Sequence, residues 1–324
     1  MRLRRFRGGV RLAPALVFSL LPLVMSVPIP APSPILRFAP SPNGPLHLGH
    51  AYSALCNEKV AAETGGRLLL RIEDLDRSRC NGEYEAAILT DLDWLGVRFA
   101  GLLARQSERA DLYRSALNRL VSQSLAYPCF CSRSDVVRLA KARDPDGAPL
   151  YPGTCKHISI HERYRRLERR EPVAWRLDMT RALKDMRGPL FWMEHGEGDV
   201  GVARRAAPER WGDVVLRGRD NAASYHLAAT TDDADQGVTD VVRGKDLLEA
   251  TSVHRLLQTL LEYPAPRYRH HRLLLDMSGA KLSKSRYSPS LANLRAGGFT
   301  AAQVRAALGF GAGETGGLRV RLSA

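Results

Sequence analysis

The chain has 324 residues, of which 44% are hydrophobic and 25% charged, an ordinary composition for a globular protein large enough to bury a proper core. The formal net charge of +14 favours a phosphate-rich partner, although a genome that prefers arginine to lysine would contribute to the same value. Five unevenly placed cysteines exclude the disulfide framework of a small secreted domain.

Residues 1–34 differ in composition from the rest of the chain. Five arginines precede an apolar run over residues 13–25, and no acidic residue occurs before Ile35. The pattern is typical of a secretory or transit peptide, but the run is too short to cross a bilayer and Pro22 interrupts it. We interpret the segment as a start codon assigned too early, with Met25 as the true start, and a real targeting peptide is the alternative. We expect it to be disordered, and the remaining chain carries +9.

The next segment, ILRFAPSPNGPLHLGH, predicts a strand, a tight turn and the start of a helix. The apolar strand 35–39 ends at Pro40, because proline removes a ladder donor and fixes φ. A turn follows at residues 43–45, and His47 and His50 then stand at the helix N-terminus. Backbone amides, the positive end of the helix dipole and two imidazoles together indicate an anion site, as for a nucleotide phosphate.

A second phosphate-binding segment is predicted far along the chain, at residues 276–285, DMSGAKLSKS. It combines a glycine, three hydroxyls and the two lysines Lys281 and Lys284. Lysine is a compact charge on a flexible stem, which suits it to following a phosphate as charge builds in a transition state.

The HLGH and KLSKS segments, in this order, resemble the signature pair of the class I aminoacyl-tRNA synthetases. RFAPSPNGPLHLGH and LLLRIEDLDRSR are similar to the glutamyl branch of that family. The resemblance implies an α/β fold with a Rossmann-like parallel sheet and an ATP site formed by His47, Gly49, His50 and Lys284. It assigns His47, His50, Lys281 and Lys284 to catalysis, and it implies Mg²⁺ with ATP.

The rest of the chain alternates between predicted strands and helices, as an α/β fold requires. Glu73 directly follows the predicted strand 67–72, at the carboxyl end where open parallel sheets bind ligands. Helices are expected at residues 47–64, 83–95, 109–125 and 249–260, and strands at 213–216, 239–242 and 268–275, with residues 243–246 beyond a strand end. Two short helices are expected within residues 290–310, with a frayed end beyond Gly311.

Three cysteines, Cys129, Cys131 and Cys155, are clustered and suit tetrahedral zinc. The residues alone leave Tyr151 or His157 as the fourth ligand, and of the two histidine is the commoner zinc ligand. The glutamyl-queuosine tRNA(Asp) synthetases carry C-x-C and Y-x-x-x-C here, so the resemblance implies Tyr151 and a structural zinc ion. Three unconnected reduced cysteines are the alternative.

Binding of glutamate requires two cations for two carboxylates and an acid for the ammonium group. Arg37 and Arg243 are the predicted cations, Glu73 the acid, and Tyr225 a hydrogen-bond donor. These residues match family positions in RFAPS, IED, SYHLA and VVRG. The resemblance therefore implies a glutamate site made of Arg37, Phe38, Ala39, Pro40, Ser41, Glu73, Tyr225 and Arg243.

The predicted organisation is a catalytic domain interrupted by one insertion. Its halves are expected at residues 35–126 and 209–288, with the zinc-containing insertion at 127–208 and a short helical extension at 289–324. About 40 residues follow the KLSKS loop, too few for the helical anticodon-binding domain of a full glutamyl-tRNA synthetase.

Resemblance to the glutamyl-queuosine tRNA(Asp) synthetases implies tRNA-independent activation of L-glutamate with ATP to glutamyl-adenylate. Transfer of glutamate to the queuosine base at the wobble position of tRNA(Asp) would follow. An ordinary glutamyl-tRNA synthetase and a non-catalytic tRNA-binding paralogue are the alternatives. The implied ligase is expected to be a cytoplasmic monomer without a membrane partner.

Overall fold

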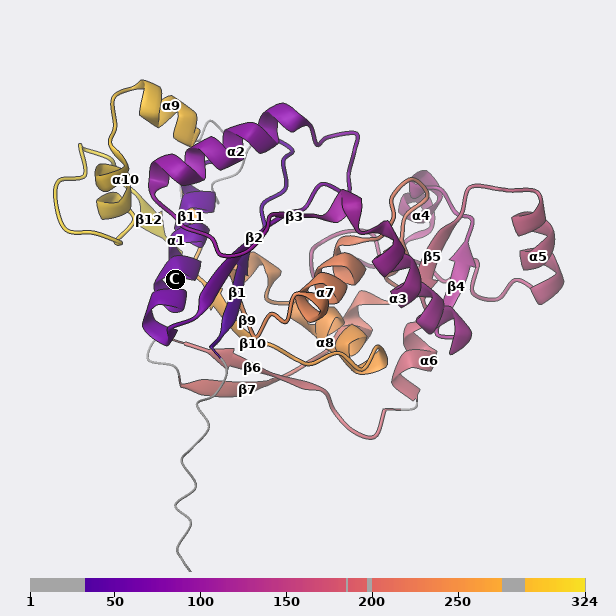
Figure 1. Cartoon of the computed structure of the whole chain (residues 1–324). Helices are drawn as coiled ribbons and strands as arrows, with labels where there is room; N and C mark the ends of the chain where they lie inside the picture. The colour runs from indigo at the N-terminus through magenta and orange to yellow at the C-terminus, as the bar shows by residue number, and fades with distance from the viewer. Residues whose placement is uncertain (1–32, 185, 197–199, 276–288, 324) are drawn as a thin grey trace, which may run out of the picture. The chain divides into compact units, whose positions relative to one another are not determined.

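The computed structural model describes residues 33–184, 186–196, 200–275 and 289–323 (Figure 1). The predicted loop with Lys281 and Lys284 lies outside the described residues, and so does nearly all of the segment 1–34. The largest element is a seven-stranded sheet in the order β3-β2-β1-β9-β10-β6-β7. All neighbouring pairs are parallel except β6 and β7, so the predicted α/β fold with a parallel sheet is confirmed.

Helices pack in two groups, each with its own apolar core, and the first core includes Leu36, Leu70 and Val242 of this sheet. One group comprises α1, α2, α9 and α10, and the other comprises α3, α6, α7 and α8 (Figure 1). The strands are β1 (Ile35–Phe38), β2 (Arg67–Ile72), β3 (Ala104–Arg105), β6 (Phe191–His195), β7 (Gly201–Arg205), β9 (Asp240–Gly244) and β10 (Arg267–His271). The helices are α1 (Leu48–Thr64), α2 (Gly82–Leu95), α3 (Ala110–Ser122), α6 (Met179–Lys184), α7 (Tyr225–Asp235), α8 (Thr251–Leu260), α9 (Leu291–Ala296) and α10 (Ala301–Ala307). The part of the chain that the structure describes also has the short 3₁₀ helices η1 (Gln106–Glu108), η3 (Pro208–Trp211) and η4 (Lys245–Leu247).

The pleat of the central strands separates apolar from charged side chains. Leu36 and Phe38 of β1 join the core with α1, whereas Arg37 between them reaches α7. The chain leaves β1 toward β2 on one side, and β9 lies on its other side. The sheet therefore has a switch point between β1 and β9, the place where open parallel sheets form ligand crevices.

A separate three-stranded antiparallel sheet carries the cysteine pattern. It consists of β4 (Ala126–Cys129), β5 (Ala174–Leu177) and β8 (Val215–Arg217). With α4 (Arg133–Leu139) and α5 (Ile160–Glu168) it forms what we call the cysteine module, on the right in Figure 1. The expected strand 213–216 thus belongs to this module, while β6 and β7 join the large sheet. The domain boundaries stay predictions.

The C-terminal residues are not frayed, because they form a two-stranded sheet with residues 274–275. Arg321–Leu322 forms β12, antiparallel to β11 (Leu274–Leu275), and Leu318 and Val320 pack on the core with α1. The expectation of a frayed end beyond Gly311 was wrong because it considered only local periodicity. Among the described residues, none of the helices combines the length and apolarity needed to cross a lipid bilayer.

Candidate active site and cysteine cluster

A cavity of about 430 Å³ lies at the switch point between β1 and β9. Its lining comes from the segments after both strands and from the first residues of α1 and α7. The cavity brings together every described residue predicted to bind glutamate or ATP: Arg37, Phe38, Ala39, Pro40, Ser41, His47, Gly49, His50, Glu73, Tyr225 and Arg243. Sequence reasoning missed six polar lining residues, which are Asn43, Tyr52, Ser53, Asp246, His271 and Arg272.

Arg37 is buried, with 5% of its surface exposed, and only one edge of its guanidinium is paired. Nε donates to Asp233 Oδ1 at 3.0 Å. The two Nη groups have no partner among the described residues. Arg37 therefore keeps a two-pronged donor surface in the cavity, the geometry that suits a carboxylate.

Glu73 is held by Arg71, a residue that sequence reasoning missed. Arg71 Nη2 donates to Glu73 Oε1 at 3.3 Å, and Nη1 donates to Asp233 at 2.8 Å. Burial raises the pKa of Glu73, and the charges of Arg71 and Arg37 oppose that rise. The charges of Arg37 and Arg71 keep the pKa of Asp233 low despite its burial. The sequence did contain a signal for this network, because Arg71 is a charged residue inside the otherwise apolar run 68–72 and the burial of such a residue favours counter-charges beside it.

Arg243 lies within β9, not beyond its end as the sequence analysis expected. The strand extends further because β10 continues to pair with it as far as Gly244. Arg243 Nη1 donates to Tyr225 Oη at 3.3 Å, so both predicted residues meet at the cavity. Its remaining N–H groups all have acceptors within the fold, unlike those of Arg37.

The two imidazoles at the start of α1 form a reciprocal cap. His47 Nδ1 accepts a hydrogen bond from Gly49 N at 3.0 Å, and His50 Nδ1 accepts one from His47 N at 3.2 Å. Since each Nδ1 is an acceptor, the hydrogen of each neutral ring is on Nε2. Both rings thus carry an N–H donor at the positive end of a helix dipole.

Gly49 is required by this cap. A Cβ at position 49 would lie 2.9 Å from Cε1 and 3.0 Å from Nδ1 of His47, closer than ordinary contacts allow. Glycine at position 49 therefore has a reason within the described fold, namely the imidazole folded over the first helical turn.

The cysteine cluster gathers four potential metal ligands. The Sγ atoms of Cys129, Cys131 and Cys155 lie within 4.8 Å of one another, so these three cysteines can bind a metal ion. Tyr151 Oη lies 3.4 Å from Cys129 Sγ and 4.0 Å from Cys131 Sγ. His157 is exposed and does not belong to the group. The geometry therefore favours Tyr151 over His157.

Hydrogen bonds within the fold prepare this cluster for a cation. Cys155 N donates to Tyr151 Oη at 2.7 Å, and Phe130 N donates to Cys155 Sγ at 3.3 Å. A hydrogen bond from the Cys155 thiol lowers the pKa of Cys129 to about 4, and the same bond raises the pKa of Cys155. The donor set fits zinc, which binds thiolates supported by such second contacts.

Comparisons with known proteins agree with this geometry. The family described as "tRNA synthetases class I (E and Q), catalytic domain" matches residues 35–308. A glutamyl-Q tRNA(Asp) synthetase from Rhodobacter capsulatus is 44% identical over 289 residues, which cover 85% of this chain and 99% of that protein. The chain belongs to the glutamyl-Q tRNA(Asp) synthetase family of the class I enzymes. Another member, from Albidiferax ferrireducens, is 39% identical, and the match covers 79% of this chain and 85% of that one.

A solved structure gives the same fold for the synthetase. A glutamate tRNA ligase from Elizabethkingia meningosepticum, crystallised in complex with its amino acid, superimposes with a TM-score of 0.69 at 26% identity. The match covers 86% of the synthetase and 60% of that longer chain. The synthetase is therefore a ligase of the aminoacyl-tRNA synthetase type with a glutamyl-tRNA synthetase-like function.

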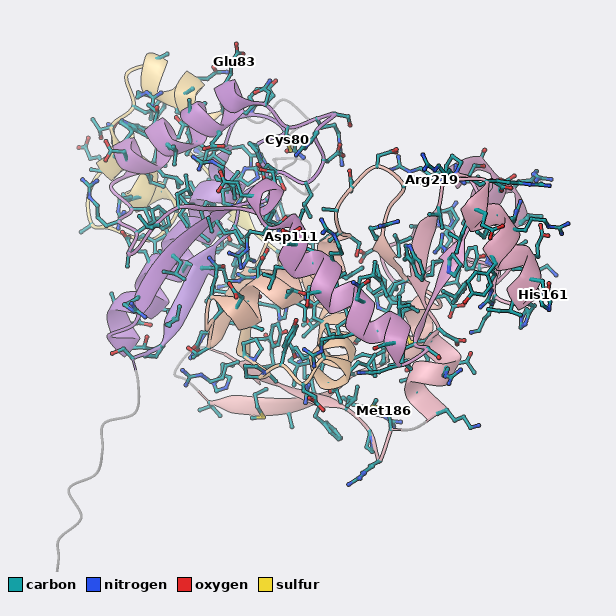
Figure 2. All side chains as sticks on the ribbon, turned by 45° about the vertical axis from the view of Figure 1, so that its right-hand side comes forward. Cys80, Glu83, Asp111, His161, Met186 and Arg219 are labelled. Atoms are coloured by element: carbon teal, nitrogen blue, oxygen red, sulfur yellow. The ribbon has the colours of Figure 1, made fainter. Side chains whose placement is uncertain are left out.

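A second and larger cavity of the synthetase, about 1290 Å³, lies between the cysteine module and the start of α7. Ser224 lines it and the next residue, Tyr225, lines the smaller cavity, so the two adjoin. Arg219, labelled in Figure 2, bonds the Phe130 carbonyl at 2.7 Å and joins the loop after β8 to the module. Five arginines line this cavity: Arg77, Arg79, Arg133, Arg176 and Arg219.

Proposed function

We propose that this synthetase activates L-glutamate with ATP in the absence of tRNA and then transfers glutamate to the queuosine base at the wobble position of tRNA(Asp). The observation that carries the proposal is the single cavity that unites the Arg37 fork, the Glu73 carboxylate and the imidazole cap of α1. The acceptor is inferred from the names of the relatives.

In the first step the α-carboxylate of glutamate attacks the α-phosphorus of ATP, and pyrophosphate leaves as the glutamyl-adenylate forms. Arg37 binds a substrate carboxylate, Glu73 pairs with the ammonium group, and Nε2–H of His47 and His50 donates to ATP phosphates. Lys284, with Lys281, is proposed to follow the pyrophosphate, and both lie outside the described residues. The enzyme contributes position and charge, and no protein nucleophile is required.

In the second step a hydroxyl of the queuosine cyclopentene ring attacks the carbonyl carbon of the adenylate. An ester forms, the hydroxyl loses its proton, and AMP leaves. The arginine-lined larger cavity adjoins the glutamate site, and its charge suits the phosphates of a nucleic-acid loop. This position supports the proposed acceptor.

Two metal ions are part of the proposal. Zinc would be held by Cys129, Cys131, Cys155 and Tyr151 in a structural role, because four protein ligands leave no position for a reacting water. Magnesium would accompany ATP and neutralise its phosphates.

The decisive experiment is transfer of labelled glutamate to tRNA(Asp) with queuosine or with guanosine at the wobble position. We expect labelling only of the queuosine form, and retention of that label when the 3′-terminal adenosine has been removed. Labelling of tRNA(Glu) at its 3′ end instead would identify an ordinary glutamyl-tRNA synthetase. Failure to exchange pyrophosphate into ATP with glutamate would contradict any adenylating role.

A further inference from the structure

Arg243 is a buried cation whose hydrogen bonds are all made to neutral groups. Its side chain is on β9 and only 5% of the residue is exposed. The guanidinium has five N–H hydrogens, and five acceptors surround it. These acceptors are His270 Nε2 at 3.1 Å, Tyr225 Oη at 3.3 Å, His254 Nδ1 at 3.2 Å, the Leu247 carbonyl at 3.1 Å and Thr251 Oγ1 at 2.7 Å.

The other buried arginines of this region are neutralised by carboxylates. Arg71 contacts Glu73, Asp232 and Asp233, and Arg37 bonds Asp233. No carboxylate of the described residues contacts the Arg243 guanidinium. A buried charge without a counter-ion is costly, so its retention at a cavity wall indicates an anionic ligand.

The contacts of Arg243 fix the hydrogen positions of two histidines. Arginine only donates, so His254 Nδ1 and His270 Nε2 are both unprotonated. His254 then donates from Nε2 to His226 Nδ1 at 3.2 Å, and His270 donates from Nδ1 to Glu194 at 2.7 Å. The imidazole of His270 therefore lies between the Arg243 guanidinium and the Glu194 carboxylate.

Tyr225 connects the Arg243 guanidinium to the cavity. Its oxygen accepts from Arg243, and its own hydroxyl hydrogen has no acceptor among the described residues, although the side chain lines the cavity. Arg243 has no N–H left for a substrate unless a bond in the fold exchanges. The direct donor is therefore the Tyr225 hydroxyl, polarised by the cation behind it.

We propose that His254 and His270 are positioning residues that hold Arg243 in place without cancelling its charge, so that the cavity selects a carboxylate over the amide of glutamine. A carboxylate at either position would hold the guanidinium equally well but would neutralise it. Two neutral imidazoles hold it and leave the positive charge for the substrate. The inference rests on the proposed glutamate activation and concerns the same cavity.

The test compares His254→Glu and His254→Gln with the wild-type full chain in glutamate-dependent ATP–pyrophosphate exchange. His254→Glu places a negative charge on Arg243, and we expect the KM for glutamate to rise roughly 50-fold, the scale of one desolvated charge pair. The KM for ATP and the inhibition constant of glutamine should each stay within about 3-fold, because neither involves a carboxylate at this position. His254→Gln retains a neutral acceptor, and its KM for glutamate should stay within about 5-fold of wild type.

A matched control adds the same charge on the surface. His161 is exposed on α5 (labelled in Figure 2), and His161→Glu should leave both KM values unchanged. An unchanged KM for glutamate in His254→Glu would overturn the proposal, and so would a rise in His254→Gln as large as in His254→Glu.

A second variant and a second measurement keep the inference separate from folding and from the proposed function. Should His254→Glu fail to fold, His254→Met removes the acceptor without adding charge. It should then raise the KM for glutamate about 10-fold, and no change would refute the proposal.

If wild type shows no exchange, the proposed function fails, and calorimetric binding of glutamate and glutamine to the same variants decides the inference alone. Weaker glutamate binding by His254→Glu, with glutamine binding unaltered, would support it, and equal glutamate binding would reject it.

Discussion

The active-site cavity and the cysteine cluster are assembled in opposite ways. The cluster takes its donors from residues 129–155, where α4 and the loop after it return Tyr151 and Cys155 to the C-x-C pair. The cavity takes its charged and polar groups from positions 37, 73, 225 and 243, which are brought together by the parallel sheet and by α7 packed on it. A local site is therefore specified by spacing, whereas the cavity depends on strand order.

The two regions also differ in what surrounds the ligand-facing groups. In the cluster the donor atoms contact one another directly. In the cavity the groups proposed to face glutamate are held by further side chains: Asp233 holds Arg37, Arg71 holds Glu73, and Arg243 holds Tyr225. Substitutions in the cavity should therefore reduce activity with little change in stability. Substitutions in the cluster should instead reduce the stability of the fold.

The largest effect is expected in the cavity, from Arg37→Ala. This variant removes a buried guanidinium that lines the cavity and whose two Nη groups have no partner among the described residues. Glutamate-dependent exchange should therefore fall by at least about 1,000-fold. Thermal unfolding should change much less than activity. Arg67→Ala, at the exposed start of β2, is the matched control and should retain full exchange. Near-normal exchange by Arg37→Ala would reject its role.

The cysteine cluster should show the reverse profile. Cys131→Ser should reduce bound zinc, measured by atomic absorption, from about one ion per chain to nearly none, and should lower Tm by more than about 5 °C. Exchange measured well below the Tm should stay within about 5-fold, since the proposed role of the cluster is structural. Cys80→Ser, outside the cluster, serves as the control. Unchanged zinc content in Cys131→Ser would remove that residue from the ligand set.

A smaller effect should distinguish the part of the cavity proposed to bind ATP from the part proposed to bind glutamate. Gly49→Ala puts a methyl group 2.9 Å from the His47 ring, so the imidazole must move and its cap bond weakens. A lost cap costs about 1 kcal/mol, and the KM for ATP should therefore rise roughly 5- to 10-fold. The KM for glutamate should not change. Equal increases in both KM values would mean that the cavity behaves as one unit.

The last effect is on stability and not on activity, a pH dependence that arises from His226, which contacts His254. Burial, with the charge of Arg243, lowers the pKa of His226 to about 4 from its ordinary value of 6.5. The unfolded chain binds this proton below pH 6.5 and the folded chain does not, so the free energy of unfolding falls between pH 6.5 and 4 by at most about 1.4 kcal/mol per pH unit.

Urea denaturation at several pH values measures this contribution. In His226→Gln the histidine contribution is absent, so the stability difference between wild type and variant should shrink as the pH falls from 7 to 4. His161→Gln on the surface should run parallel to wild type. Parallel curves for His226→Gln and wild type would show that His226 does not titrate in this way.

Local patterns predicted most of the elements but not the pairing of the strands. The helix at residues 47–64, with Gly65 in the left-handed conformation after it, follows from its capping residues. The strands β6 and β7 were missed, and β8 was assigned to the wrong sheet, because periodicity identifies a strand and not its neighbour. Arg71 was missed for a related reason: its partners Asp232 and Asp233 lie on α7, far away in sequence.

The sequence by itself predicted the candidate residues: two imidazoles after a strand and a turn, three clustered cysteines with a tyrosine or histidine nearby, and arginines and an acid beside strand ends. Only the tertiary structure decided how the charges are shared, with Arg71 neutralised, Arg37 half paired and Arg243 held by neutral histidines. The physical reason is that an electrostatic environment depends on distances across the sheet. Those distances are set by strand order and by the helices packed over it, which no local pattern encodes.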